Sequence, residues 1–200
     1  MEKETPAAIT IFPLEGGCAC GQVRYRLETR PLIVHCCHCT SCQRETGTAF
    51  AINAVIESTL VTRLPPAPPS VPASRTQAIK PAGPPLTRGE DEDSTELKTI
   101  KTPSESGRGQ QIVRCRTCQV AVWSHYGAAG SRTRFMRVGT LDEAWKVQPD
   151  VHIYTQSKRS FFKLDGLIPE FEEFYPMKEG VWREESIGRW EVHMKSDDKA

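Results

Sequence analysis

The segment IVHCCHCTSCQRETGTAF, residues 33–50, concentrates the side chains of this sequence that can bind a metal. Four of the eight cysteines and two of the five histidines fall in the eight positions from His35 to Cys42. Thiolates and imidazoles are common zinc ligands in proteins. The other four cysteines form two close pairs, Cys18-Ala-Cys20 and Cys115-Arg-Thr-Cys118. This spacing indicates metal chemistry at two places in the fold.

Disulfides are the alternative use of eight cysteines. The start of the chain, MEKETPAAITIFPLEGG, has no basic region followed by an apolar run, so we expect no secretory signal and a cytoplasmic protein. Disulfides do not persist in reducing compartments, and clustered cysteines there favour metal binding. No stretch approaches the ~20 apolar residues of a membrane span. The net charge of +1 argues against nucleic acid as a partner.

The two outer cysteine pairs predict a structural zinc site. Cys115 and Cys118 have the spacing of a C-x-x-C knuckle. Cys18 and Cys20 point to the same side if the backbone is extended, because side chains alternate along a strand. Four thiolates from two loops would form a closed tetrahedral site, which is typical of structural zinc. Such a site can contribute on the order of 10 kcal/mol to folding.

The central cysteines predict a second, more open site. The same alternation places Cys37 and Cys39 on one side, and Cys42 can turn back after two small residues. Three protein ligands with an exchangeable fourth position are typical of a catalytic zinc, which would bind and deprotonate an incoming thiol. His35 also has the right parity and, as a fourth ligand, would close the site. Cys36 is interpreted as a spare buried thiol.

The remaining histidines receive structural interpretations first. His38 is expected to support the ligands or to lie on the surface rather than to be a ligand, and His125 and His193 are expected to be hydrogen-bonded structural histidines. His152 is interpreted in the same way, with proton transfer as a second hypothesis. The aromatic residues are assigned to the core, and these are Trp123, Phe135, Trp145, Tyr154, Phe161, Phe162 and Phe171.

Short strands must position these ligands. The segment 22–28 alternates apolar Val23, Tyr25 and Leu27 with charged residues, which predicts a strand with one buried face. Further strand-like runs are expected at 50–56, 95–102, 111–115, 120–126, 133–141 and 151–156. No helical period is sustained over three turns, so the chain is predicted to be mainly β.

The domain organisation follows from changes in composition. Residues 1–14 are expected to be an N-terminal arm, and residues 15–185 a single zinc domain. Within it, 63–94 holds eight of the fifteen prolines and few apolar residues, which predicts an insertion without a core of its own. Residues 186–200 are interpreted as a polar tail.

Several of these motifs together resemble the glutathione-dependent formaldehyde-activating (GFA) family, which includes centromere protein V. The similar stretches are GGCACGQVRYRLE, CHCTSCQRETGTAF, the later C-x-x-C and VGTLDEAWKVQPDVHIYTQSKRSFFKLDGLIPEF. The resemblance implies a β-tent zinc fold with two zinc ions. One would be structural at Cys18, Cys20, Cys115 and Cys118, and one reactive at Cys37, Cys39 and Cys42.

The sequence departs from the family pattern at four places. Gln43 stands where the family usually has Arg, and Gln119 where it usually has Gly. The segment before the late cysteine pair, usually short, carries the insertion here. Phe161 or Phe162 replaces a usual Trp. These changes leave the zinc ligands intact. They allow a substrate other than the glutathione adduct of formaldehyde, since a fold does not fix a function.

The leading functional hypothesis is a zinc-dependent carbon–sulfur lyase of the GFA type. It would act on a small-molecule substrate, a glutathione adduct or another carbonyl electrophile, at Cys37, Cys39 and Cys42. Residues after the ligands were assigned to the substrate pocket, namely Thr46, Gly47, Thr48 and Phe50. The alternatives are a diverged enzyme of specialised metabolism, a non-catalytic binding module that uses the insertion, and a thiol sensor. A homodimer is a further expectation.

Overall fold

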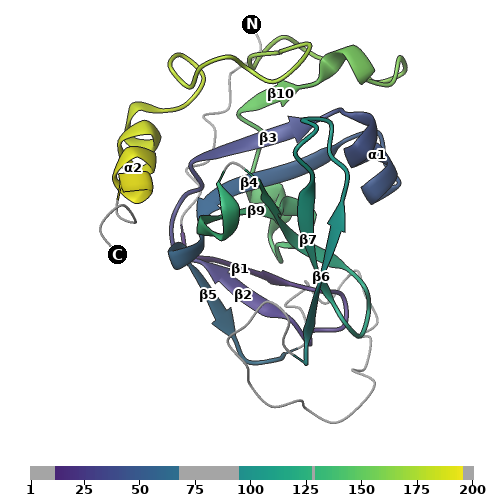
Figure 1. The fold of residues 1–200 in the computed structure, drawn as a ribbon, viewed down its shortest axis with the longest axis vertical. Helices are drawn as coiled ribbons and strands as arrows, with labels where there is room; N and C mark the ends of the chain where they lie inside the picture. Colours follow the sequence, from purple (N-terminus) through teal and green to yellow (C-terminus); the bar gives the residue numbers. More distant parts are fainter. Residues whose placement is uncertain (1–11, 68–94, 128, 196–200) are drawn as a thin grey trace, which may run out of the picture.

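Two β-sheets make up most of the structure, a computed structural model that describes residues 12–67, 95–127 and 129–195 (Figure 1). The smaller sheet has the order β1-β2-β5, with strands Leu14–Gly17, Arg24–Leu27 and Val61–Leu64. The larger sheet has the order β10-β3-β4-β9-β8-β7-β6. Its strands in chain order are β3 Ile33–Cys37, β4 Ala51–Glu57, β6 Leu97–Thr102, β7 Gln110–Cys115, β8 Ala121–Tyr126, β9 Thr133–Arg137 and β10 Val151–Ile153.

Helices are few among the described residues. They are α1 Thr40–Thr46, α2 Glu184–Lys195 and single 3-10 turns at Ser58–Leu60, Gly130–Arg132, Val138–Thr140, Ala144–Lys146 and Thr155–Ser157. The expectation of a mainly β fold is confirmed. Within the part of the chain described here, no helix has the length and apolar character needed to cross a bilayer.

The small sheet is joined to the large one through the GTLD segment. Tyr25 OH lies 2.6 Å from Thr140 Oγ1, and Arg24 makes a two-pronged ion pair with Asp142 at 2.7 and 2.5 Å. Arg24 is therefore buried although the alternation of β2 predicted a solvent-facing charge. A Cβ on Gly16 would lie 2.6 Å from the carbonyl oxygen of Thr140, so only glycine permits this close packing.

The shared core lies between the two sheets. Tyr25 and Trp123 are fully buried and meet edge to face, with ring centroids 6.4 Å apart. Val23 and Leu27 are also fully buried, as the alternation of segment 22–28 predicted. This apolar contact fixes the small sheet over β7 and β8, the strands that flank the second outer cysteine pair.

The described boundaries differ from the predicted ones at residue 14 and at residues 63–64. Leu14 of the predicted arm already pairs with Leu27. Arg63 and Leu64, assigned to the insertion, belong to β5 and pair with Tyr25 and Arg24. The rest of that insertion from residue 68 onward lies outside the described residues. Two aromatic residues assigned to the core are instead on the surface, because Trp145 is 58% and Phe161 73% exposed.

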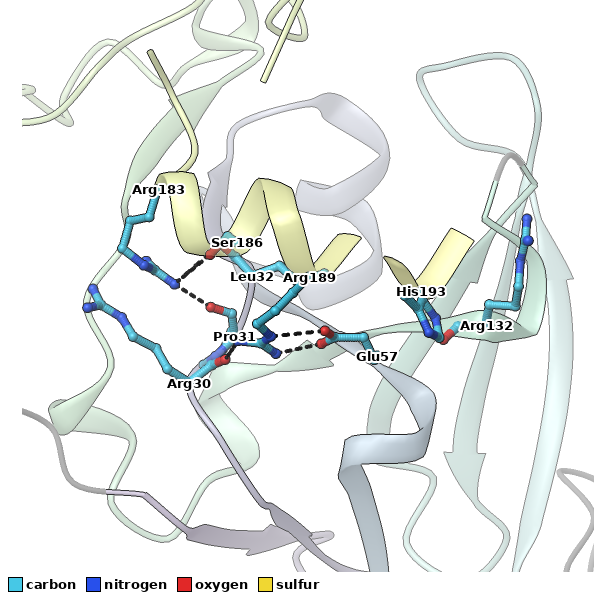
Figure 2. A network of polar contacts seen from close by, with 9 residues as sticks. All are labelled: Arg30, Pro31, Leu32, Glu57, Arg132, Arg183, Ser186, Arg189 and His193. Atoms are coloured by element: carbon cyan, nitrogen blue, oxygen red, sulfur yellow. Dashed lines mark hydrogen bonds and ion pairs between the residues drawn. The ribbon is translucent and has the colours of Figure 1, made fainter. Parts of the chain in front are cut away.

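The expected polar tail is helical from Glu184 to Lys195, so the prediction of no sustained helix was wrong. The reason is that α2 is held by polar contacts at long sequence separation, which its periodicity does not reveal. Arg189 donates to both carboxylate oxygens of the buried Glu57, at 3.1 and 2.7 Å, and to the carbonyl of Arg30 at 2.9 Å (Figure 2).

The two ends of this segment are also anchored. Arg183 donates to the carbonyl of Pro31 at 2.6 Å and to Ser186 Oγ at 3.0 Å (Figure 2). Near the other end, His193 Nε2 lies 2.9 Å from the carbonyl oxygen of Arg132. These contacts hold α2 against the loop before β3 and against the ends of β4 and β9.

We expect Arg189→Ala to destabilise the protein by about 3 kcal/mol, because it leaves the carboxylate of Glu57 buried without its partner. Urea unfolding measures this loss. The control is Lys195→Ala, whose ion pair with Glu191 is exposed and should contribute less than about 0.5 kcal/mol. Equal effects of the two substitutions would contradict the role assigned to the Arg189–Glu57 pair.

Candidate metal centres and active-site cavity

The first group of cysteines joins two turns that are far apart in sequence. Cys18 and Cys20 lie in the turn between β1 and β2, and Cys115 and Cys118 enclose the turn between β7 and β8. Cys18 Sγ is 3.5 Å from Cys20 Sγ, which is 3.7 Å from Cys115 Sγ. All four sulfurs lie within 4.8 Å of one another. Four thiolates around a tetrahedral zinc are separated by about 3.8 Å, so this donor set fits zinc.

The local backbone of each turn aims the sulfurs inward. The amide of Val23 donates to Cys18 Sγ at 3.2 Å. In the other turn, the amide of Gln119 donates to the carbonyl of Cys115, and Gln119 adopts a left-handed conformation with φ of 63°. This is the position where the family usually has glycine, so Gln119 reaches the same backbone shape with a side chain.

The second group is built at the junction of β3 and α1. Cys37 is the last residue of β3, Cys39 caps the N-terminus of α1, and Cys42 lies in its first turn. The cap forms because Cys39 Sγ accepts a hydrogen bond from the amide of Cys42 at 3.3 Å. The helix ends at Gly47, which is left-handed with φ of 66°. The three sulfurs lie within 4.8 Å of one another and are buried.

The three sulfurs together favour only one negative charge in the absence of a cation. Hydrogen bonds from the thiols of Cys37 and Cys42 lower the pKa of Cys39 to about 3. The pKa values of the two thiols that donate these bonds are raised, and that of Cys37 is raised strongly. A second and third thiolate therefore require a positive ion at the centre of the cluster. The donor set and its electrostatics both fit a zinc site.

Arg137 supplies a fixed positive charge near this cluster. It is buried in β9, donates to Asn53 Oδ1 and, at 2.9 Å, to Ser124 Oγ. Its charge favours the ionised form of Cys42. Arg137 was not among the predicted site residues, and its only signal in the sequence is its place within the strand-like FMRVG run.

The three central cysteines line a cavity of about 500 Å³. Aromatic side chains form much of its remaining wall, and they are Tyr126, Phe135, Tyr154, Phe174, Tyr175, Trp182 and Trp190. Polar lining is sparse and includes Asn53, Glu105, Arg108, Gln110 and Lys178. An apolar concave site with a few convergent polar groups is typical of a small-molecule site.

His35 also lines the cavity, but its nitrogen binds a tyrosine. Its Nε2 lies 2.8 Å from Tyr175 OH, and Trp182 Nε1 donates to the same hydroxyl at 2.7 Å. Because the indole can only donate, the hydroxyl hydrogen of Tyr175 is available to His35. Burial lowers the pKa of His35 to about 3, so the ring is neutral. The alternative of His35 as a fourth ligand is not favoured by this arrangement, since the ligand group comprises the three cysteines.

The residues predicted to line the substrate pocket lie elsewhere. Thr46, Gly47 and Thr48 form the exposed end of α1, and Phe50 packs against His38 and Phe162. None of the four is among the described residues that line the cavity. The sequence analysis placed them there because they follow the ligands, but α1 turns this stretch away from the cavity.

His152 also lies away from the cavity. The parallel register of β10 and β3 pairs His152 with Cys36 and Ile153 with Cys37, so Ile153 is the residue that lines the cavity beside the ligands. His152 Nδ1 instead lies 3.0 Å from His38 Nε2. This position gives no support to its predicted role as a proton carrier. His38 is fully buried.

The other two histidines have the expected structural contacts. His125 Nδ1 is 2.7 Å from the carbonyl of Thr133, and His193 binds the carbonyl of Arg132. Residues missed by the sequence analysis are mostly aromatic side chains of segment 174–190. Their only signal was the concentration of aromatic residues in PEFEEFYPM and in the tryptophans that follow.

The chain belongs to the glutathione-dependent formaldehyde-activating enzyme family, GFA, whose family profile matches residues 13–75 and 88–157. Among solved structures, a crystal structure of a Rhodobacter sphaeroides protein is 16% identical and has a TM-score of 0.39. That match covers 78% of this chain and 99% of the other. No curated protein sequence matches the chain.

We expect loss of the four-cysteine site to affect folding far more than loss of the three-cysteine site. Cys115→Ser should lower the free energy of unfolding by about 5 kcal/mol or more, because a structural zinc contributes on the order of 10 kcal/mol. Cys37→Ser should cost much less, since α1 and β3 keep their backbone hydrogen bonds. Urea unfolding with parallel elemental analysis measures both. Equal destabilisation by the two substitutions would contradict the assignment.

Proposed function

We propose that this protein is a zinc-dependent carbon–sulfur lyase that acts on the adduct of a thiol and a carbonyl compound. The observation that supports this most is the position of the three-cysteine cluster in the wall of a cavity large enough for a small molecule. A site with three protein ligands that faces a cavity leaves the fourth position to an exchangeable group. The four-cysteine site has its ligands complete and is proposed to be structural.

Cys37, Cys39 and Cys42 would hold the zinc ion. When bound, the ion would stabilise the substrate sulfur as a thiolate and polarise a carbonyl oxygen. In the forward direction a carbon–sulfur bond forms between the thiol and the carbonyl carbon, and the oxygen gains the proton that the sulfur loses. The lyase direction reverses these changes. No oxidant or reductant is needed.

Tyr126 is proposed as the group that holds the proton at the substrate oxygen. Its side chain lines the cavity with the three cysteines. Burial raises the pKa of Tyr126 well above its ordinary value, so the phenol keeps its proton and can donate a hydrogen bond. Aromatic side chains surround it in the cavity wall, and their low polarity strengthens such a polar contact.

The cavity lining favours an electrophile larger than formaldehyde. Glutathione carries two carboxylates, and the cationic groups in the lining are Arg108 and Lys178. The much larger aromatic surface matches an apolar or aromatic group on the carbonyl side. Four of the aromatic residues lie beyond the segments that match the family, namely Phe174, Tyr175, Trp182 and Trp190. We therefore infer a substrate specific to this chain, with glutathione as the candidate thiol.

The proposed compartment is the cytoplasm. All eight cysteines are free thiols in the structure, and the two metal clusters require their reduced form. A reducing compartment maintains that form.

We expect Cys39→Ala to abolish turnover, with at least a 100-fold loss, while the protein remains folded. The measurement is the formation or cleavage of thiol adducts, followed with glutathione and a panel of carbonyl compounds. The control is Thr40→Ala, the exposed neighbour whose side chain does not line the cavity. Full activity of Cys39→Ala, or no wild-type activity on any thiol–carbonyl pair, would refute the lyase proposal.

A second experiment separates the two substrate classes. If the aromatic wall binds the carbonyl component, Trp190→Ala should raise KM for an aromatic aldehyde adduct about tenfold or more and leave KM for the formaldehyde adduct nearly unchanged. Steady-state kinetics on both adducts measure this difference. Equal changes for both adducts would remove the argument for the larger electrophile.

A further inference from the structure

A third cluster of side chains that can bind a metal lies on the face of β3 opposite the three-cysteine cluster. Cys36, His38 and His152 bring one sulfur and two imidazole nitrogens within 4.8 Å of one another. Cys36 and Cys37 are neighbours on a strand, so their side chains point to opposite faces. The three-cysteine cluster occupies the cavity face, and neither Cys36, His38 nor His152 lines that cavity.

The measured separations fit a common ligand set. Cys36 Sγ lies 3.6 Å from His38 Nε2, and His38 Nε2 lies 3.0 Å from His152 Nδ1. Around a tetrahedral zinc, with its usual bond lengths, a sulfur and a nitrogen are about 3.5 Å apart and two nitrogens about 3.3 Å. The three side chains therefore need only small shifts to bind one ion.

The cluster is rigidly held and shielded from water. Cys36 is 2% exposed, His38 is 0% exposed and His152 is 8% exposed. The amide of His38 donates to the carbonyl of Ile153 at 2.9 Å, which fixes the spacing of the two imidazoles. Phe50 and Phe162 pack on the ring of His38, with centroids 5.7 and 5.8 Å away.

The present hydrogen bonds leave one nitrogen of this buried pair unsatisfied. His38 Nδ1 has no hydrogen-bond partner among the described residues, although the side chain is fully buried. A buried imidazole without a full set of partners is costly for hydrogen bonding alone. An ion at Nε2 would not satisfy Nδ1, because coordination at one ring nitrogen leaves the proton on the other. The ligand separations and the burial of the cluster are therefore the observations that favour the site.

We propose that Cys36, His38 and His152 form a third metal site, and that its ion is Zn²⁺. One thiolate and two neutral imidazoles are a ligand set suited to zinc. The site would connect β3 to β10, an edge strand of only three residues. Since Ile153 of β10 and the segment after it form part of the cavity wall, the ion would stabilise that wall. This proposal does not depend on the lyase activity.

The test is the zinc content of the full-length chain, measured by elemental analysis against protein concentration. Cys36→Ala should bind one zinc ion fewer than the wild type. His152→Asn should show the same loss and provides the comparison if Cys36→Ala does not fold. The matched control is Val34→Ala, which shortens a buried side chain two positions earlier on the same strand face and should retain the wild-type content.

Cobalt substitution identifies the ligands. The Cys37→Ser/Cys39→Ser variant lacks the central site and should bind two Co²⁺ ions. Adding Cys36→Ala to this variant should remove one of these ions. The thiolate-to-cobalt absorption that belongs to that ion should disappear with it. Equal zinc content in wild type, Cys36→Ala and His152→Asn would overturn the proposal. Loss of lyase activity with unchanged metal content in Cys36→Ala would also overturn it.

Discussion

The fold depends on a link between two turns that are separated by 94 residues of sequence. With zinc bound, Cys18 and Cys20 on one side and Cys115 and Cys118 on the other would hold the small sheet against β7 and β8 of the large one. The buried contact between Tyr25 and Trp123 and the ion pair between Arg24 and Asp142 follow from that placement. A chain of this length with a modest apolar fraction gains from such a link, because it offsets the entropy of closing a long loop.

The two cysteine groups are proposed to bind the same metal for different purposes. In the four-cysteine group both pairs lie in turns between antiparallel strands, away from the cavity. In the three-cysteine group the ligands lie where β3 ends and α1 begins, and this junction faces the cavity. The proposed difference in role, structural for one group and catalytic for the other, therefore rests on the surroundings of the sulfurs as well as on their number.

The features that could be predicted from the sequence are those that depend on local backbone geometry. The ligand groups were predicted from the C-x-x-C spacing and from the parity of cysteines in extended backbone, and the strands from short apolar or alternating runs. The positions of His152 and Phe50 were not predictable in this way, because a strand's face depends on its register with a neighbour. The contacts of α2 were also missed, since Arg189 meets Glu57 across 132 positions. Such pairings carry no periodic signal within the segment itself.

The segment after β10 contributes part of the cavity wall and none of the proposed zinc ligands. The metal ligands and their supporting strands lie within the segments that match the family, whereas Tyr175, Trp182 and Trp190 of the cavity wall come after them. Substitutions in this late segment can therefore change which molecules fit the cavity without disturbing any sulfur. The shape of the cavity and the geometry of the proposed metal ligands can therefore be altered independently of one another.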